Sequence, residues 1–128
     1  PDRAVNVAGD LPLSDLPALL ERIGWLLAND TGVAHIAYAT GTPSLTLFWR
    51  SRPELSGPLV GRDRHRVLYR GELCEGCQQG QCVYPVCARA ITVEDVLAVA
   101  RSALAVMATL HKGRWRLGLS RGDGGSGE

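Results

Sequence analysis

The stretch "NDTGVAHIAYATGTP", residues 29–43, decides how the rest of the chain is interpreted. One apolar run, residues 25–28, leads into it, and a second, residues 44–48, follows it. The continuous run at 25–28 is typical of a strand that is buried on both faces of a parallel sheet. Between them the small residues predict a short helix from Val33 to about Ala39, which Gly41 ends. The stretch therefore predicts a strand, a helix and a second strand, with polar residues where the first strand meets the helix.

The flanking sequence continues this alternation. A weak strand is expected at 4–8, and Ser14 is a candidate N-cap for a helix from residue 16 to residue 23 with apolar residues at helical spacing. A long loop is predicted at 49–66 and a short strand at 66–69. Thr92 and Asp95 then have the spacing of a capping box before a long helix.

Alternating strands and helices predict an α/β fold with a parallel sheet of about four strands. A complete doubly wound domain usually has more strands. We therefore expect a partial Rossmann-like parallel sheet, the later part of a larger domain. Residues 1–112 would form it, and the basic, Gly-rich residues 113–128 would be a disordered tail.

Composition places the chain among ordinary globular proteins. It has 128 residues, 45% of them hydrophobic, which is enough for one modest domain with a core. A formal net charge of +1 argues against a dedicated nucleic-acid binder. No apolar run approaches the roughly 20 residues of a membrane span, and the first residues do not resemble a signal peptide. We therefore expect a cytoplasmic protein.

The polar residues of the junction suit an anion. In open α/β sheets, ligands bind at the carboxyl ends of strands, beside the free N–H groups of the next helix. Gly32 lets a phosphate approach the backbone, Thr31 adds a hydroxyl, and His35 lies off the buried face of the helix. Asp30 would repel a phosphate, so it is expected to accept hydrogen bonds from a sugar or to brace the loop. A structural alternative stays open, in which Asp30 and Thr31 only cap the helix and His35 is solvated.

Residues 9–48, "GDLPLSDLPALLERIGWLLANDTGVAHIAYATGTPSLTLF", resemble the C-terminal region of glycosyltransferase family nine, the ADP-heptose:lipopolysaccharide heptosyltransferase family. The shared features are a Leu-rich helix, a strand, Asp-[Thr/Ser]-Gly-x-x-His, a small-residue helix, Gly-x-Pro and an apolar strand. Residues 57–74, "GPLVGRDRHRVLYRGELC", resemble the family's Gly-Pro and His-Arg-Val-Leu segment. The resemblance covers about residues 5–110.

The resemblance implies the donor-binding part of an inverting GT-B transferase. Thr31, Gly32 and His35 would hold the diphosphate of a nucleotide-diphosphate sugar such as ADP-heptose, and Asp30 would contact the donor sugar. The acceptor would be a lipopolysaccharide-type or lipid-linked glycan, reached by peripheral contact at the inner face of the cell membrane. A carboxylate in an N-terminal domain would be the general base, so we expect no catalytic residue and no required cofactor in this chain, and no activity from it alone.

One departure from the family lies after the second apolar run. The family often has Phe-Gly-Pro-Thr there, where a hydroxyl can meet the donor, whereas this chain has Phe48-Trp49-Arg50-Ser51. The bulky Trp49 and the charged Arg50 put that contact in question. The nearby His65, in the arginine-rich stretch "GRDRHR", is expected to be a solvated loop residue.

Four cysteines lie close together, at Cys74, Cys77, Cys82 and Cys87. Four thiolates in a short loop can bind Zn²⁺ tetrahedrally and stabilise a segment that has no core of its own. Four reduced thiols are the competing interpretation, and disulfides or an iron–sulfur cluster are further alternatives. A non-catalytic, zinc-stabilised binding module that keeps the fold is accordingly the second functional hypothesis. A partial sheet with an open edge also predicts that the chain dimerises.

Overall fold

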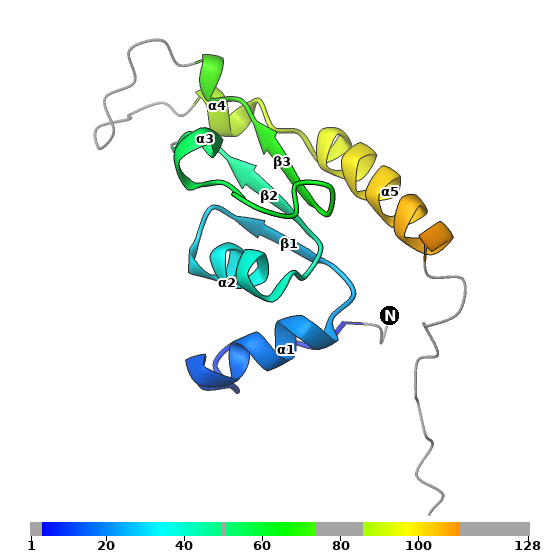
Figure 1. The fold of residues 1–128 in the computed structure, drawn as a ribbon. Helices are drawn as coiled ribbons and strands as arrows, with labels where there is room; N and C mark the ends of the chain where they lie inside the picture. The colour runs from blue at the N-terminus through cyan, green and yellow to red at the C-terminus, as the bar shows by residue number, and fades with distance from the viewer. Residues whose placement is uncertain (1–3, 50, 74–85, 111–128) are drawn as a thin grey trace, which may run out of the picture.

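A computed structural model of the chain describes residues 4–49, 51–73 and 86–110, and Figure 1 shows their arrangement. Within them, three parallel strands form one sheet in the order β1-β2-β3. Helices precede, connect and follow the strands, so the predicted α/β class is confirmed. The elements are the 3-10 helix Leu13–Asp15, α1 (Leu16–Arg22), β1 (Leu26–Asn29), α2 (Gly32–Thr40), β2 (Ser44–Phe48), α3 (Pro53–Ser56), β3 (His65–Tyr69), the 3-10 helix Gly71–Leu73, α4 (Val86–Arg89) and α5 (Val93–Leu110).

The sheet is in register from its first residues. Leu26 pairs with Ser44, and Ser44 pairs with His65. Side chains of paired residues in parallel strands point to the same face, and the faces alternate along each strand. The hydroxyl of Tyr38 in α2 donates a hydrogen bond of 2.8 Å to Thr46 Oγ1, so α2 covers the face that carries Ser44, Thr46 and His65.

The core lies on both faces of the sheet. Ala34 and Ala37 of α2 are fully buried, because small residues let the helix approach the strands closely. Leu45 and Phe48 of β2 are also fully buried, Leu45 on the face opposite α2, and Leu20 anchors α1 with 2% exposure. Burial of such side chains is the main force that stabilises a domain of this size.

The first predicted strand is wrong. Residues 4–7 have no regular structure, and residues 8–10 form a turn. Val5 is 86% exposed, so this short apolar stretch does not pair with a strand of the sheet. The described residues therefore hold three strands rather than about four.

Three local predictions also need correction. Ser14 lies in the 3-10 helix before α1, and its hydroxyl donates to Asp15 instead of capping α1. β1 was expected to be buried on both faces, but Leu27 is 47% exposed because no described element covers that side of this edge strand. The predicted loop at 49–66 contains the short helix α3, and β3 begins at His65.

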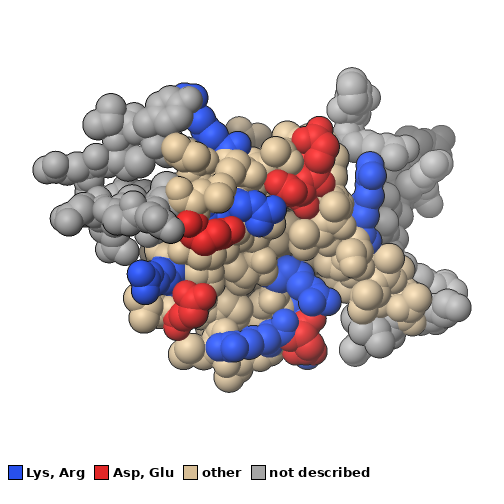
Figure 2. Space-filling view, turned by 90° about the horizontal axis from the view of Figure 1, so that it is seen from above, with Lys and Arg blue, Asp and Glu red and all other residues tan. Residues whose placement is uncertain are grey.

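Other predicted features fall outside the described residues. These are the tail at 113–128 and three of the four cysteines, Cys74, Cys77 and Cys82. Among the described residues, no helix is both long and apolar enough to cross a bilayer. The face drawn in Figure 2 carries acidic and basic side chains side by side, not one basic surface.

Candidate functional site

The candidate site is the turn between β1 and α2, at the carboxyl end of the sheet. β1 ends at Asn29, and the N–H of Asp30 donates to the carbonyl of Leu47 at 3.1 Å, which ties the turn to β2. Thr31 is the extended N-cap residue of α2, with φ −146° and ψ 171°. The predicted residues Asp30, Thr31, Gly32 and His35 are therefore placed together at one end of a helix.

The start of α2 has no side-chain cap. The hydroxyl of Thr31 points backward and donates to the carbonyl of Asn29 at 3.3 Å. The carbonyl of Thr31 accepts from Ala34 and His35, but the N–H groups of Gly32 and Val33 have no partner among the described residues. Unbonded N–H groups at the positive end of a helix dipole attract an anion.

The space in front of Gly32 is open. A Cβ atom placed on Gly32 would meet no atom within 4 Å, and its backbone φ is not in the left-handed region. The fold itself therefore does not require glycine at this position. An approaching ligand does benefit from it, because the absent side chain leaves the N–H groups accessible.

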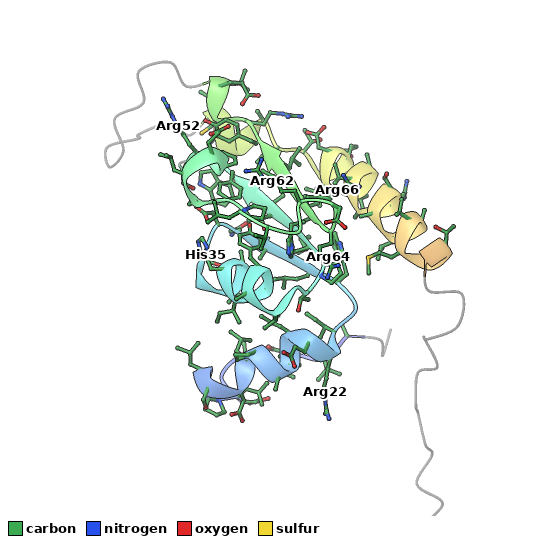
Figure 3. The ribbon with its side chains drawn as sticks, viewed as in Figure 1. Arg22, His35, Arg52, Arg62, Arg64 and Arg66 are labelled. Carbon is green, nitrogen blue, oxygen red and sulfur yellow. The ribbon has the colours of Figure 1, made fainter. Side chains whose placement is uncertain are left out.

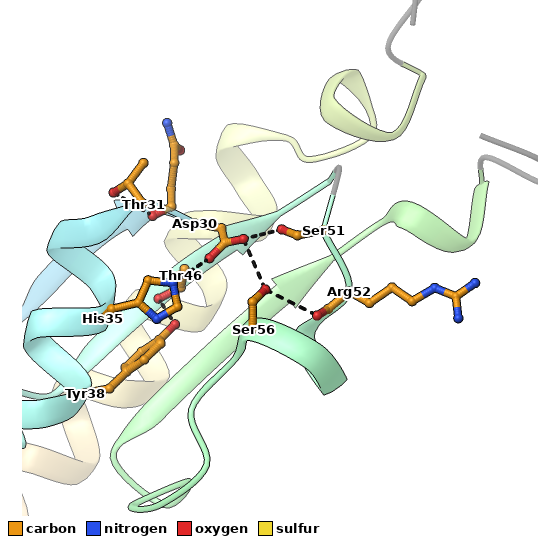
Figure 4. Close-up of polar contacts among 9 residues, drawn as sticks. Asp30, Thr31, His35, Tyr38, Thr46, Ser51, Arg52 and Ser56 are labelled. Atoms are coloured by element: carbon orange, nitrogen blue, oxygen red, sulfur yellow. Dashed lines mark hydrogen bonds and ion pairs between the residues drawn. The ribbon is translucent and has the colours of Figure 1, made fainter. Parts of the chain in front are cut away.

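Asp30 is held by the segment that follows β2, as Figure 4 shows. Its Oδ2 atom accepts hydrogen bonds from the hydroxyls of Ser51 and Ser56. Its Oδ1 atom is buried without a hydrogen bond and lies 3.4 Å from Nε2 of His35. We treat this as a charge contact, because the geometry is not that of a hydrogen bond. The Asp30 carboxylate therefore ties the end of β1 to the segment after β2, and it does not cap α2.

Sequence reasoning missed the two serines. Ser51 occupies the position of the threonine in the family's Phe-Gly-Pro-Thr segment, and this alignment was the available signal. The departure at Trp49 and Arg50 therefore leaves a hydroxyl at the following position, and this hydroxyl bonds Asp30. Ser56 in α3 gave no comparable signal.

His35 lies half exposed at the mouth of this cluster, with 50% of its side chain accessible. Its ring meets the ring of Tyr38 edge to face, with centroids 5.6 Å apart. Burial raises the pKa of Tyr38, the hydrogen bond with Thr46 lowers it, and the charge of Asp30 raises it. Tyr38 is thus a neutral neighbour that supports the imidazole ring.

His65 is buried, not a solvated loop residue, with 4% exposure at the start of β3. Its Nδ1 atom lies 3.0 Å from the hydroxyl of Ser44, and its ring centroid is 5.0 Å from that of Tyr38. Burial is the main cause that lowers the pKa of His65, with the nearby Arg64 as the next cause. His65 belongs to the interior under α2 and not to the candidate site.

The arginines do not gather at His35, as Figure 3 shows. Arg64 and Arg66 line a pocket of about 370 Å³ together with Trp25 and Met107. That pocket lies at the amino ends of the strands, opposite the candidate site. It holds the acids Glu21 and Asp63 beside the two arginines, so its charges do not specify one kind of ligand.

The cysteine prediction is only partly described. Cys87 lies in α4 and is buried, with 2% exposure, while the other three cysteines lie outside the described residues. No three His, Cys, Asp or Glu side chains come together as a metal site within the described part.

Comparison with known proteins gives one family match and two similar proteins. Residues 1–87 match glycosyltransferase family 9 (heptosyltransferase). The chain is 34% identical over 64 residues to the lipopolysaccharide core heptosyltransferase OpsX of Haemophilus influenzae. The matched region covers 50% of this chain and 18% of OpsX. It is 32% identical over 69 residues to lipooligosaccharide heptosyltransferase 2 of the same organism, covering 54% of this chain and 20% of that protein.

The chain thus matches about a fifth of the length of these relatives. No solved structure matches it. The family match extends over more than half of the chain and includes the whole junction from Asp30 to His35. The chain belongs to glycosyltransferase family 9.

Proposed function

We propose that the chain is the donor-binding part of an inverting glycosyltransferase of the GT-B fold. The enzyme would transfer a sugar, heptose in the first instance, from a nucleotide-diphosphate sugar to a lipopolysaccharide-type glycan. The observation that carries this proposal is the uncapped start of α2, where two N–H groups, the open space at Gly32 and the exposed His35 converge. Family membership and the names of the two relatives support heptose and the glycan acceptor.

The strand order supports the location of the donor. Three parallel strands in sequential order correspond to one half of a doubly wound sheet, in which the other half continues from the first strand. β1 has no partner on its outer edge among the described residues. The point where the strand order would reverse is therefore beside β1, and ligands of such sheets bind at the carboxyl ends there. Asp30 follows β1 at that end.

In the proposed reaction, this chain binds the leaving group. The acceptor hydroxyl attacks the anomeric carbon, its proton goes to a carboxylate outside this chain, and the nucleoside diphosphate departs. Negative charge develops on the diphosphate as the glycosidic bond breaks. The N–H groups of Gly32 and Val33 and the imidazole of His35 would stabilise that charge, since fixed donors need no reorganisation during the reaction. The hydroxyl of Thr31 would join them by turning away from the carbonyl of Asn29.

Calorimetric titration tests the proposal. ADP, GDP, UDP, AMP and ADP-heptose are titrated separately against the purified polypeptide. We expect a nucleoside diphosphate to bind and AMP to bind at least tenfold more weakly, because a single phosphate cannot reach all the donors. Equal affinity for AMP and ADP, or no binding by any of these ligands, would contradict a diphosphate site at α2.

A structural zinc ion bound by Cys74, Cys77, Cys82 and Cys87 remains part of the proposal. The 3-10 helix Gly71–Leu73 packs against α4, so the two ends of the cysteine-rich segment lie close together. Protein purified without added metal should contain about one zinc per chain, and a chelator should lower its melting temperature. Rapid reaction of all four thiols in metal-free, folded protein would contradict a zinc site.

A further inference from the structure

The carboxylate of Asp30 is almost fully committed within the protein. Its side chain is 17% exposed. Oδ2 accepts from Ser51 and Ser56, which lie 21 and 26 residues further along the chain. Oδ1 is buried and faces His35. A carboxylate oxygen accepts about two hydrogen bonds, so Oδ2 has no further capacity for a sugar hydroxyl.

We infer that Asp30 acts on the donor through His35, and that Ser51 and Ser56 are positioning residues that aim its carboxylate at the imidazole. This inference rests on the donor site proposed above. In this arrangement Asp30 does not touch the sugar. Ser51 and Ser56, in the segment after β2, hold the carboxylate, and the carboxylate contacts His35. The charge of Asp30 offsets the positive charge of a protonated His35, which is the form that binds a diphosphate.

The orientation of the imidazole follows from these contacts. Nε2 is the ring nitrogen that lies 3.4 Å from the Asp30 carboxylate, while Nδ1 has no hydrogen-bond partner among the described residues. When the ring is protonated, Nδ1 is a second donor on the opposite side. Asp30 thus holds one edge of the ring and leaves the other for the ligand.

The other groups around His35 do not compete for this role. Tyr38 approaches with its ring and gives its hydroxyl hydrogen to Thr46, and burial keeps its pKa high. The segment after β2 contributes hydroxyls, and the guanidinium of Arg52 points away from the carboxylate in Figure 4. Glu54 of α3 is exposed and makes no ion pair among the described residues. Within the part of the chain that the structure describes, Asp30 is therefore the charged group that faces the ring.

A double-mutant cycle on ADP binding tests the inference. Asp30→Asn keeps the size of the side chain and should weaken ADP binding about tenfold. In a His35→Ala background the same change should alter affinity less than twofold, because the group through which Asp30 acts is gone. Ser51→Ala and Ser56→Ala should each weaken binding in the same direction but by less. Ser14→Ala, an exposed serine that contacts Asp15, is the control and should have no effect.

Two results of the cycle are decisive when wild-type protein binds ADP. Coupling between Asp30 and His35 supports the inference. Fully additive losses overturn it, since Asp30 would then contact the ligand by itself. Melting temperatures of all variants separate these outcomes from loss of folding.

A readout without ligand covers the case in which no nucleotide binds and the proposed function fails. The chemical shifts of the His35 ring protons are followed by NMR at one fixed pH. Asp30→Asn should change these shifts because it removes the charge that lies 3.4 Å from Nε2, and Ser51→Ala should change them in the same direction by less. Ring-proton shifts that stay unchanged in both variants overturn the inference, whether or not ADP binds.

Discussion

The two longest helices among the described residues, α2 and α5, begin in opposite ways. At α5, the Thr92 hydroxyl accepts from the N–H of Asp95 at 3.1 Å, and the Asp95 carboxylate accepts from the N–H of Thr92 at 3.1 Å. This is the reciprocal capping box that the sequence predicts. At α2, Thr31 stands in the same N-cap position, but no side chain caps the helix.

One residue explains much of the difference. The third residue after Thr92 is Asp95, whereas the third residue after Thr31 is Ala34, which has no acceptor and is fully buried against the sheet. At α5 the two side chains therefore bind the N–H groups of Thr92 and Asp95, whereas at α2 no side chain binds an N–H group of the first turn, and those of Gly32 and Val33 stay open. An uncapped helix start that faces open space at the carboxyl end of a sheet is a sign of ligand binding, and a capped one is a sign of stability.

The largest expected effect comes from closing the open end of α2. Gly32→Val places a branched side chain in front of the free N–H groups, so ADP binding should fall at least a hundredfold while stability changes by less than about 1 kcal/mol. Gly41→Val is the matched control at the other end of α2. Gly41 has φ 71°, so valine there should cost about 1–2 kcal/mol of stability. Its ADP affinity should stay near that of wild type.

Calorimetry and thermal unfolding of both glycine variants check this prediction. Wild-type affinity in Gly32→Val would mean that the open helix start is not where the ligand binds. The comparison between α2 and α5 would then concern stability alone.

Removing the imidazole is the next largest change. His35→Ala leaves the start of α2 in place but deletes one donor to the diphosphate. It should weaken ADP binding by about 1–3 kcal/mol, the range for a hydrogen bond between charged groups. Because His35 is half exposed, the melting temperature should move little. Unchanged affinity in a folded variant would assign His35 to the solvated surface.

The sequence predicted the elements whose signals are local. The apolar runs of β1 and β2 give the strands, the small residues between them give α2, and Thr92 with Asp95 gives the start of α5. The residue types of the candidate site could also be predicted, because they lie within six positions of one another. Their roles toward a ligand remain predictions.

Contacts between distant segments could not be predicted in this way. Ser51 and Ser56 reach Asp30 only because β2 places the following segment beside the end of β1. His65 stands among charged neighbours in the sequence, which suggested a solvated loop. The register of β3 against β2 instead puts it opposite Ser44, under α2. The register between two strands cannot be predicted from the types of single residues.

A matched pair of threonine variants compares the starts of α5 and α2, with smaller expected effects than those of Gly32→Val and His35→Ala. Thr92→Ala removes the cap of α5 and should lower the free energy of unfolding by about 1 kcal/mol, with no effect on ADP binding. Thr31→Ala removes a hydroxyl that caps nothing, so stability should change by less than about 0.5 kcal/mol. ADP binding should weaken severalfold in that variant. Equal stability losses in the two variants would remove the distinction between the two helix starts.

The smallest expected effect is the pH dependence of the α5 cap. The pKa of Asp95 lies below its ordinary value of 3.8, first because the backbone N–H of Thr92 donates to the carboxylate. The Thr92 side chain lowers this pKa further, and Arg70 adds a smaller contribution in the same direction. The unfolded carboxyl therefore binds a proton at higher pH than the folded one. The stability contributed by Asp95 is fully present above pH 3.8 and is lost as the pH falls through the folded pKa.

Asp95→Asn should have a lower melting temperature than wild type at neutral pH, and the difference should shrink toward zero in acid. Glu94→Gln, in the same helical turn, should differ from wild type by less at neutral pH. A difference between Asp95→Asn and wild type that is constant with pH would mean that the ionised carboxylate does not contribute to the cap, and the contrast between α5 and the open α2 would then rest on Thr92 alone.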